Sequence, residues 1–297
     1  MLRVSLSRTP KLNGVWGLYA MGQYRIPKAI PEFRKSYALV CADQTADTMV
    51  VFVHGFGGTP TSTWLDFHGL VKICSVNYPW WEKCDLFFYS YESLRTPIGV
   101  NAQTLGRFVD HILSKDAIGS PRFPTSSGES HTRLIFVGHS EGAVVIRRLL
   151  LDKLYAIEKA NAHKDDLVLK TAKADIVLNS QLRLFAPACM GTNLSSLLGF
   201  ATSLSTLVSA IASSSLVRNE LLPNSPILRP IESETENASA KFQEISGFAA
   251  KVLFGDHDQV VYTASYKCDE INYANGQDHF SICKPDFSYL RPLEFVL

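Results

Sequence analysis

The feature that most restricts the fold of this chain is the stretch FVGHSEGAVVIRRLL at residues 136–150. An apolar run leads into Ser140, Gly138 and Gly142 stand two positions to either side, and a leucine-rich, helix-like run follows. On a tight strand-to-helix turn a serine has a strained backbone, and its hydroxyl projects clear of the sheet. Glycines relieve crowding there, and the helix N-terminus favours developing negative charge. The stretch predicts an acyl-transfer nucleophile; the alternative is a glycine-flanked serine in an ordinary loop.

Apolar runs alternate with helical patterns along the whole chain. Continuous Val, Leu and Phe runs are typical of strands covered on both faces, as in a parallel sheet. Residues 101–113 and 142–157 each place apolar side chains on one helical face. We therefore expect an α/β protein with one mostly parallel, doubly wound sheet in a single domain, 1–297. The predicted strands are 48–55, 85–91, 133–140, 249–258 and, more weakly, 181–188.

One segment interrupts the alternation, because residues 191–217 contain no charged side chain. One helical face of this segment would carry Leu194, Leu197, Leu198, Ala201, Leu204, Val208 and Ile211, and serines and threonines fill much of the rest. A membrane-spanning helix is disfavoured by the hydroxyl content and by the stripe. We expect either an amphipathic lid over a concave site or a pair of packed core helices. The lid reading makes 191–248 a cap insertion whose residues 194–217 contact a membrane surface peripherally.

Composition excludes several partners and sites. The formal net charge is +1 and no dense Lys/Arg run is present, so we expect no nucleic-acid partner. The six cysteines are scattered without a C-x-x-C pair, which is typical of reduced thiols in a cytoplasmic protein and not of a zinc site. The basic first residues, MLRVSLSRTPKL, allow a mitochondrial presequence, but an edge strand explains their alternation better.

A nucleophilic serine needs a general base and an acid that orients the base. Three histidines follow the serine: His163, His257 and His279. His163 lies at or beyond the end of the expected elbow helix, away from the strand ends, so His257 and His279 remain as candidates for the base. Asp256 and Asp258 flank His257, so alternation directs their side chains away from its ring. His279, on a later loop, can meet an acid from the end of the 249–258 strand. We predict the order Ser140, Asp258, His279, with Asp256 as the reserve acid.

The glycine-rich turn after the 48–55 strand supplies the remaining part of such a site. The turn reads His54-Gly55-Phe56-Gly57-Gly58. We assign the oxyanion donors to the backbone N–H groups of Phe56 and Glu141, with His54 supporting the loop through hydrogen bonds. A phosphate-binding loop is excluded because no Lys-Ser/Thr follows the glycines. We expect no cofactor and no metal ion.

Four stretches, VFVHGFGG, VGHSEGAVVIRRLL, GDHDQVV and DHFSICKP, together resemble the landmarks of the α/β-hydrolase superfamily in order. The last of them and DLFFYSYESL look most similar to the serine-active-site-containing proteins and the GPI-inositol-deacylase-like lipases. The resemblance implies an α/β-hydrolase fold and ester hydrolysis or acyl transfer on lipid-like substrates. Glu141 departs from that branch, where an apolar residue or glutamine usually follows the nucleophile. We expect its carboxylate to place negative charge near Ser140 and His279 and to disfavour anionic substrates.

The leading functional hypothesis is a serine esterase or lipase that cleaves neutral carboxylic esters. An amidase or peptidase, or an acyltransferase, on the same triad is the alternative within catalysis. A non-catalytic, ligand-binding α/β-hydrolase-fold module is the alternative of another class, disfavoured because the serine, acid, histidine and oxyanion glycines are all present.

Overall fold

Eight strands form one central sheet in the computed structural model, which describes residues 28–40, 46–65, 67–74, 77–114, 131–162, 164–193 and 219–297. Their order across the sheet is β1-β2-β4-β3-β5-β6-β7-β8. The first two strands pair antiparallel, and all neighbours from β4 to β8 are parallel. The strands are β1 (Lys28–Ala29), β2 (Tyr37–Leu39), β3 (Thr48–Val53), β4 (Cys84–Tyr89), β5 (Arg133–His139), β6 (Gln181–Phe185), β7 (Ala250–Gly255) and β8 (Glu270–Ala274).

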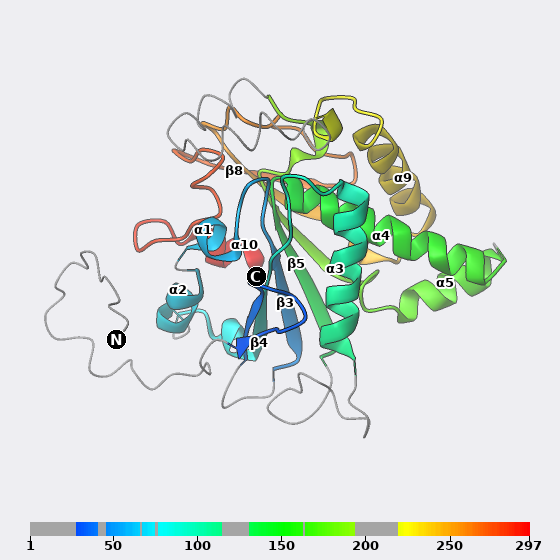
Figure 1. The fold of residues 1–297 in the computed structure, drawn as a ribbon, viewed down its shortest axis with the longest axis horizontal. Coiled ribbons are helices and arrows are strands. Elements are labelled where there is room, and N and C mark those ends of the chain that lie inside the picture. The colour runs from blue at the N-terminus through cyan, green and yellow to red at the C-terminus, as the bar shows by residue number, and fades with distance from the viewer. Residues whose placement is uncertain are drawn as a thin grey trace, which may run out of the picture.

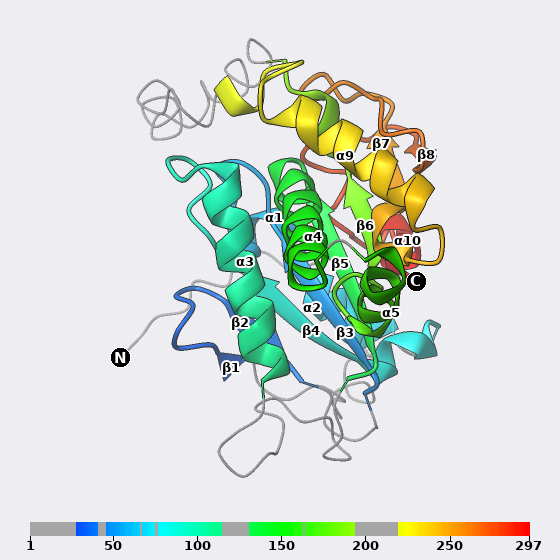
Figure 2. The same ribbon diagram turned by 90° about the vertical axis from the view of Figure 1, so that its right-hand side faces the viewer.

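Helices cover both faces of this sheet (Figures 1 and 2). The layer on one face contains α3 (Ile98–Leu113), α4 (Glu141–Ala160) and α5 (Asp165–Ala174), and α9 (Leu228–Lys241) packs against α4. The other face carries α1 (Pro60–Trp64), α2 (Phe67–Cys74) and α10 (Arg291–Val296). Short 3-10 helices span Pro79–Lys83, Ala188–Met190 and Ser246–Phe248. The arrangement confirms the predicted α/β class and the doubly wound, mostly parallel sheet.

Strands β3 and β4 are buried along their full length, as their unbroken apolar runs predict. Between β3 and its helical cover, the Phe52 ring stacks on Phe88 at a centroid distance of 4.5 Å. It also meets Trp64 and Phe67 edge-on, at 5.2 and 4.9 Å. Burying each such ring contributes roughly 1.5–3 kcal/mol. This aromatic cluster fixes the α1–α2 layer on the sheet directly beneath the turn that follows β3.

The strand ends differ from the predicted ones. The predicted 249–258 strand ends at Gly255, because the N–H of Asp258 turns back to the Gly255 carbonyl at 3.2 Å. This early end places Asp258 on a loop. The predicted helix at 142–157 begins one residue earlier and continues to Ala160.

Several predicted features fall outside the described residues: the N-terminal stretch, His163, and the uncharged segment from residue 194 onward. The lid, the cap boundaries at 191–248 and the membrane contact therefore stay predictions. No helix in the described part of the chain is long and apolar enough to span a bilayer. Among the described residues, Cys189, Cys268 and Cys283 are free thiols.

Candidate active site

Ser140 occupies the turn between β5 and α4. It is the N-cap residue of α4 and has φ 53° and ψ −121°, a left-handed conformation that costs a non-glycine residue roughly 1–3 kcal/mol. Hydrogen bonds from its neighbours hold it there: its N–H donates to the Phe185 carbonyl, and its own carbonyl accepts from the N–H groups of Ala143 and Ala188, each at 3.1 Å. The structure therefore has the strained strand–serine–helix turn that the sequence predicts.

The glycines around the serine are needed for contacts with the rest of the fold. A Cβ on Gly142 would lie only 2.4 Å from the carbonyl oxygen of Val53, at the end of β3. On Gly138 it would meet an isoleucine side chain of α4 at 2.8 Å, and on Gly55 it would meet Cβ of Ser140 at 2.7 Å. The expected crowding around the serine is therefore present, and the neighbouring groups that cause it belong to β3 and α4. The lack of a side chain at Gly55 lets the turn after β3 pack against the serine.

The structure brings Ser140, His279 and Asp258 into one hydrogen-bonded chain. Nε2 of His279 lies 3.1 Å from Oγ of Ser140, and Nδ1 lies 3.0 Å from Oδ2 of Asp258. The other Asp258 oxygen accepts from the N–H groups of Val260 and Val261, at 2.8 and 3.2 Å. A carboxylate only accepts, so Nδ1 carries the hydrogen and Nε2 is left to accept the serine proton. Ser140 is 4 % exposed and His279 is 3 % exposed, so this chain is shielded from bulk water.

The other candidate acids accept hydrogen bonds elsewhere, and the other candidate histidine is exposed to solvent. Asp256 is exposed and accepts from the N–H of Gly276 at 2.7 Å. Asp278 accepts from the N–H groups of Phe280 and Ser281, each at 2.8 Å, and so shapes the loop that carries the histidine. His257 is exposed on the turn after β7. Of the acids considered from the sequence, Asp258 alone bonds to His279 within the described part of the chain.

His54 fixes the turn after β3 and is itself held on both ring nitrogens. Nδ1 donates to the Gly55 carbonyl at 2.9 Å, and Nε2 accepts from the Tyr91 N–H at 3.3 Å. The Tyr91 hydroxyl donates to the His54 carbonyl at 2.8 Å, and the two rings stack at 4.4 Å. Burial lowers the pKa of His54 to about 4, so the ring is neutral at physiological pH. Sequence reasoning missed Tyr91, because it lies after a different strand.

Two backbone N–H groups beside the serine, those of Phe56 and Glu141, have no acceptor among the described residues. The N–H of Gly57 donates to Oγ of Ser93 at 2.9 Å and is used in holding the loop. Within the described ranges no acceptor receives a hydrogen bond from the N–H of Phe56 or of Glu141. These two N–H groups are the ones that the sequence assigns to the oxyanion.

The environment of the Glu141 side chain bears on its expected charge. It is fully buried, and neither oxygen has a hydrogen-bond partner in the part of the chain described. Burial raises the pKa of this carboxyl well above its usual range and the Glu220 carboxyl adds to the rise, which the Asn101 amide opposes only in part. Burial therefore disfavours the negative charge expected near Ser140 and opposes the benefit of the helix dipole.

Two further groups support the site, and no motif pointed to their roles. Nε2 of His139 donates to the carbonyl of His279 at 2.8 Å, and burial lowers the pKa of His139 well below its usual range. This bond ties the histidine loop to the residue before the serine. On α4, the buried Arg147 pairs with the buried Asp269 at 2.5 Å and links the serine-bearing helix to the segment before β8.

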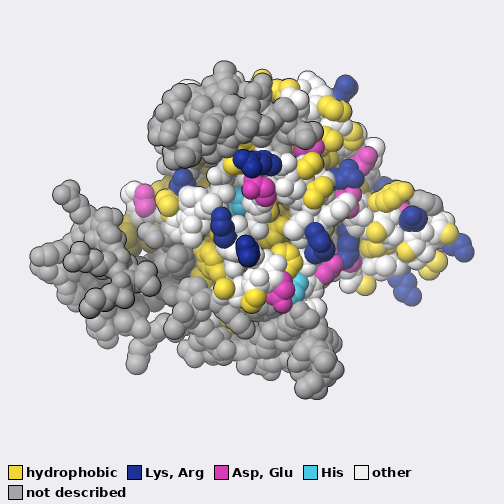
Figure 3. Space-filling view, viewed as in Figure 1, with side chains coloured by type: hydrophobic (Ala, Val, Ile, Leu, Met, Phe, Trp, Pro, Cys, Tyr) yellow, Lys and Arg dark blue, Asp and Glu magenta, His cyan; other side chains and the backbone are white. Residues whose placement is uncertain are grey.

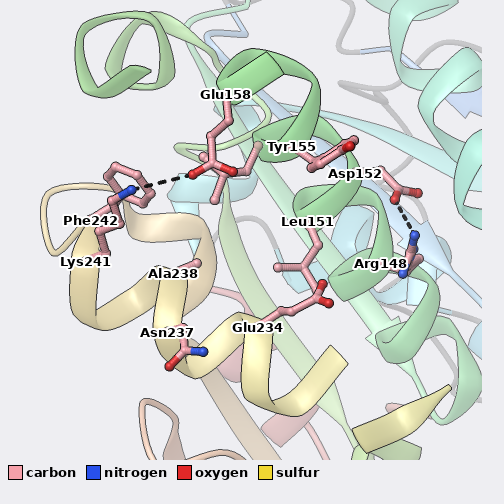
Figure 4. A pocket seen from close by; sticks show the side chains of 11 residues that line it. Arg148, Leu151, Asp152, Tyr155, Glu158, Glu234, Asn237, Ala238, Lys241 and Phe242 are labelled. Atoms are coloured by element: carbon pink, nitrogen blue, oxygen red, sulfur yellow. Dashed lines mark ion pairs between the residues drawn. The ribbon is translucent and has the colours of Figure 1, made fainter. Parts of the chain in front are cut away.

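The surface outside this site is mixed in charge. On the face shown in Figure 3, the described Lys and Arg side chains are interspersed with Asp and Glu. A groove of about 430 Å³ lies between α4 and α9 (Figure 4). It begins at Arg148, about 12 Å along the helix from Ser140 at 1.5 Å per residue, and none of the predicted site residues lines it. Among the described residues, no group of three or more His, Cys, Asp or Glu side chains could hold a metal ion.

No protein-family model matches the chain, and no curated protein matches it in sequence. Several solved structures are similar to the chain in fold. The lipase BlEst2 of Bacillus licheniformis is 13% identical, with a TM-score of 0.51 over 88% of this chain and 97% of that one. The phospholipase PlaB of Legionella pneumophila is 19% identical, with a TM-score of 0.48 over 71% of this chain; the match spans only 39% of PlaB. The peroxisomal hydrolase Lpx1 of Saccharomyces cerevisiae is 10% identical, with a TM-score of 0.47 over 92% and 89%. The strand order, the helices on both faces and the likeness to BlEst2 show that the chain has the α/β-hydrolase fold.

Proposed function

We propose that this protein is a serine hydrolase that cleaves carboxylic esters through an acyl-enzyme on Ser140. The observation that carries the proposal is the continuous hydrogen-bonded chain from Ser140 through His279 to the fully buried Asp258 carboxylate. Serine, acid and histidine in this order along the chain are one of the recurring arrangements of nucleophilic catalysis on this fold.

In the first half-reaction, Oγ of Ser140 attacks the ester carbonyl carbon while Nε2 of His279 accepts its proton. The carbonyl oxygen becomes an oxyanion, which accepts hydrogen bonds from the N–H groups of Phe56 and Glu141. The bond to the alkoxy oxygen then breaks, and the departing alcohol takes the proton from His279. In the second half-reaction water attacks the acyl-enzyme, His279 again accepts and returns a proton, and the acid leaves Ser140 free.

Asp258 keeps the hydrogen of His279 on Nδ1 and stabilises the imidazolium that forms in each half-reaction. Two backbone N–H groups already hold its other oxygen, so the carboxylate is oriented before substrate arrives. His54 has no chemical step. Its two ring hydrogen bonds hold the turn that presents the Phe56 N–H.

The substrate is proposed to be a lipid-like ester. The likeness to the lipase BlEst2 favours this class. The narrower resemblance to the GPI-inositol-deacylase-like lipases stays a prediction.

The test is hydrolysis of p-nitrophenyl esters of increasing acyl length, with matched p-nitroanilides, by the wild-type chain and by Ser140→Ala. We expect ester turnover by the wild type and a loss of several orders of magnitude in the variant. Preference for the anilides would assign an amidase or peptidase, and acylation of an added alcohol would assign an acyltransferase. A folded wild type without turnover on any of them would favour the ligand-binding module.

A further inference from the structure

Among the described residues, no group neutralises the carboxyl of Glu141. Tyr91, Glu92 and Glu220 face it with acidic groups, and no basic side chain of the described residues contributes to its pKa. Asn101 lies beside it, but its amide donates to the backbone carbonyls of Glu92 and Thr96, at 3.2 and 3.0 Å. A carboxyl in this position is tolerated as an uncharged acid and is destabilising as a carboxylate.

The groups around Glu141 are themselves committed. Glu220 accepts from the N–H of Ile98 at 2.9 Å, and Glu92 accepts from the N–H of Leu94 at 3.0 Å. The Tyr91 hydroxyl donates to the His54 carbonyl, and burial, followed by the Glu141 carboxyl, keeps the pKa of Tyr91 well above its usual range. None of these groups can supply a charge that would compensate a carboxylate at position 141.

We propose that Glu141 is a charge-setting residue of the oxyanion hole, uncharged in the active enzyme, and that ionisation of its side chain at alkaline pH switches catalysis off. The inference rests on the proposed function, because the N–H of the same residue is one of the two oxyanion donors. A carboxylate on that residue would oppose the negative charge that develops on the substrate oxygen. In a buried site such repulsion is only weakly screened.

The sign of the effect on stability follows from the raised pKa. Between the pKa of an unfolded glutamate and the raised pKa in the fold, the folded state holds a proton that the unfolded state has released. Raising the pH through this window therefore destabilises the wild-type fold. The Glu141→Gln side chain has nearly the same size and cannot ionise, so the variant escapes this loss.

The activity test compares kcat/KM on a short p-nitrophenyl ester across the pH range up to about 10, where tyrosine and lysine begin to titrate. Each enzyme is normalised to its own value near neutrality, and spontaneous hydrolysis is subtracted. We expect the wild type to lose about tenfold per pH unit beyond the ionisation of Glu141, and Glu141→Gln to change less than about twofold over the same interval. The matched control Glu92→Gln, which removes a neighbouring exposed carboxyl, should keep the alkaline loss.

Thermal unfolding of the same proteins gives a readout that needs no substrate. The Tm advantage of Glu141→Gln over the wild type should grow with pH from neutrality upward, while Glu92→Gln should show no such growth. The proposal is overturned by an alkaline loss that persists in Glu141→Gln, by a wild-type profile still flat at about pH 10, or by a Tm difference that does not change with pH. Absence of ester turnover at every pH would overturn both the proposed function and the control of catalysis by Glu141. If the Tm difference still grew with pH in that case, the side chain of Glu141 would nevertheless be shown to be uncharged near neutrality.

Discussion

The ion pair between Arg147 and Asp269 predicts a large loss of stability from a change far from the reacting atoms. Arg147 lies on α4, is 1 % exposed, and donates to Oδ1 of Asp269 at 2.5 Å and to the carbonyl of Phe248 at 2.6 Å. Burial opposes its charge, but Asp269, Cys189 and Tyr266 together outweigh burial, so the pKa of the guanidinium is raised. The Asp269 carboxylate also accepts from the N–H groups of Ala250 and Tyr266.

Replacing Arg147 by Met removes both of its hydrogen bonds and leaves a carboxylate with 0 % exposed side chain without its counter-charge. Breaking one partner of such a buried pair costs about 3–5 kcal/mol. The neighbouring Arg148 is the matched control, because its pair with Asp152 on the same helix is partly exposed, with side chains 38 % and 31 % exposed (Figure 4). Arg148→Met should cost at most about 1 kcal/mol, the range of surface pairs.

The assay is urea unfolding of the wild type, the two single variants and the double variant Arg147→Met/Asp269→Asn, followed by intrinsic fluorescence. We expect a much lower midpoint for Arg147→Met and almost none of that shift for Arg148→Met. The double variant should recover part of the loss, because the uncompensated charge is gone. Equal midpoints for the two arginine variants would refute the reasoning, since burial would then have no bearing on the value of the pair.

Two further comparisons test the site and its frame. Asp258→Asn should lower kcat on esters by orders of magnitude, whereas Asp256→Asn, which removes an exposed loop carboxylate, should leave it within a few-fold; the reverse ranking would move the orienting acid. Gly142→Ala should unfold the chain or lower its Tm strongly, because the new methyl would lie 2.4 Å from a backbone oxygen. In the control Gly99→Ala the new methyl meets nothing within 4 Å, so this change should be neutral or stabilise the fold by up to about 1 kcal/mol. Comparable Tm values for the two variants would contradict the close approach of α4 to β3.

The sheet was predictable because its central strands are buried on both faces and therefore read as unbroken apolar runs. The partners of Ser140 were predictable for a related reason: the ends of parallel strands lie along one edge of the sheet, so Asp258 after β7 and His279 after β8 converge. The ends of elements were less predictable, because a single turn hydrogen bond at Gly255 decides where β7 stops.

Contacts between residues distant in sequence could not be predicted, because they leave no recognisable pattern in the amino-acid sequence. Arg147 and Asp269 are 122 positions apart, and either one alone reads as an ordinary surface charge. Tyr91 reads as the last residue of a strand, although it holds the turn after β3. The environment of Glu141 was hidden for a similar reason. Its place in the first turn of a helix is visible in the sequence, but its complete burial, with no hydrogen-bond partner among the described residues, is not.

The central claim is an acyl-enzyme on Ser140, and covalent labelling by a fluorophosphonate probe tests it most directly. The native wild type should carry one probe adduct, which peptide mapping places on Ser140, and labelling should abolish ester turnover in proportion to its extent. Ser140→Ala should remain folded, take up no probe and lack turnover. An adduct at another residue, or ester turnover that persists in Ser140→Ala, would contradict the account.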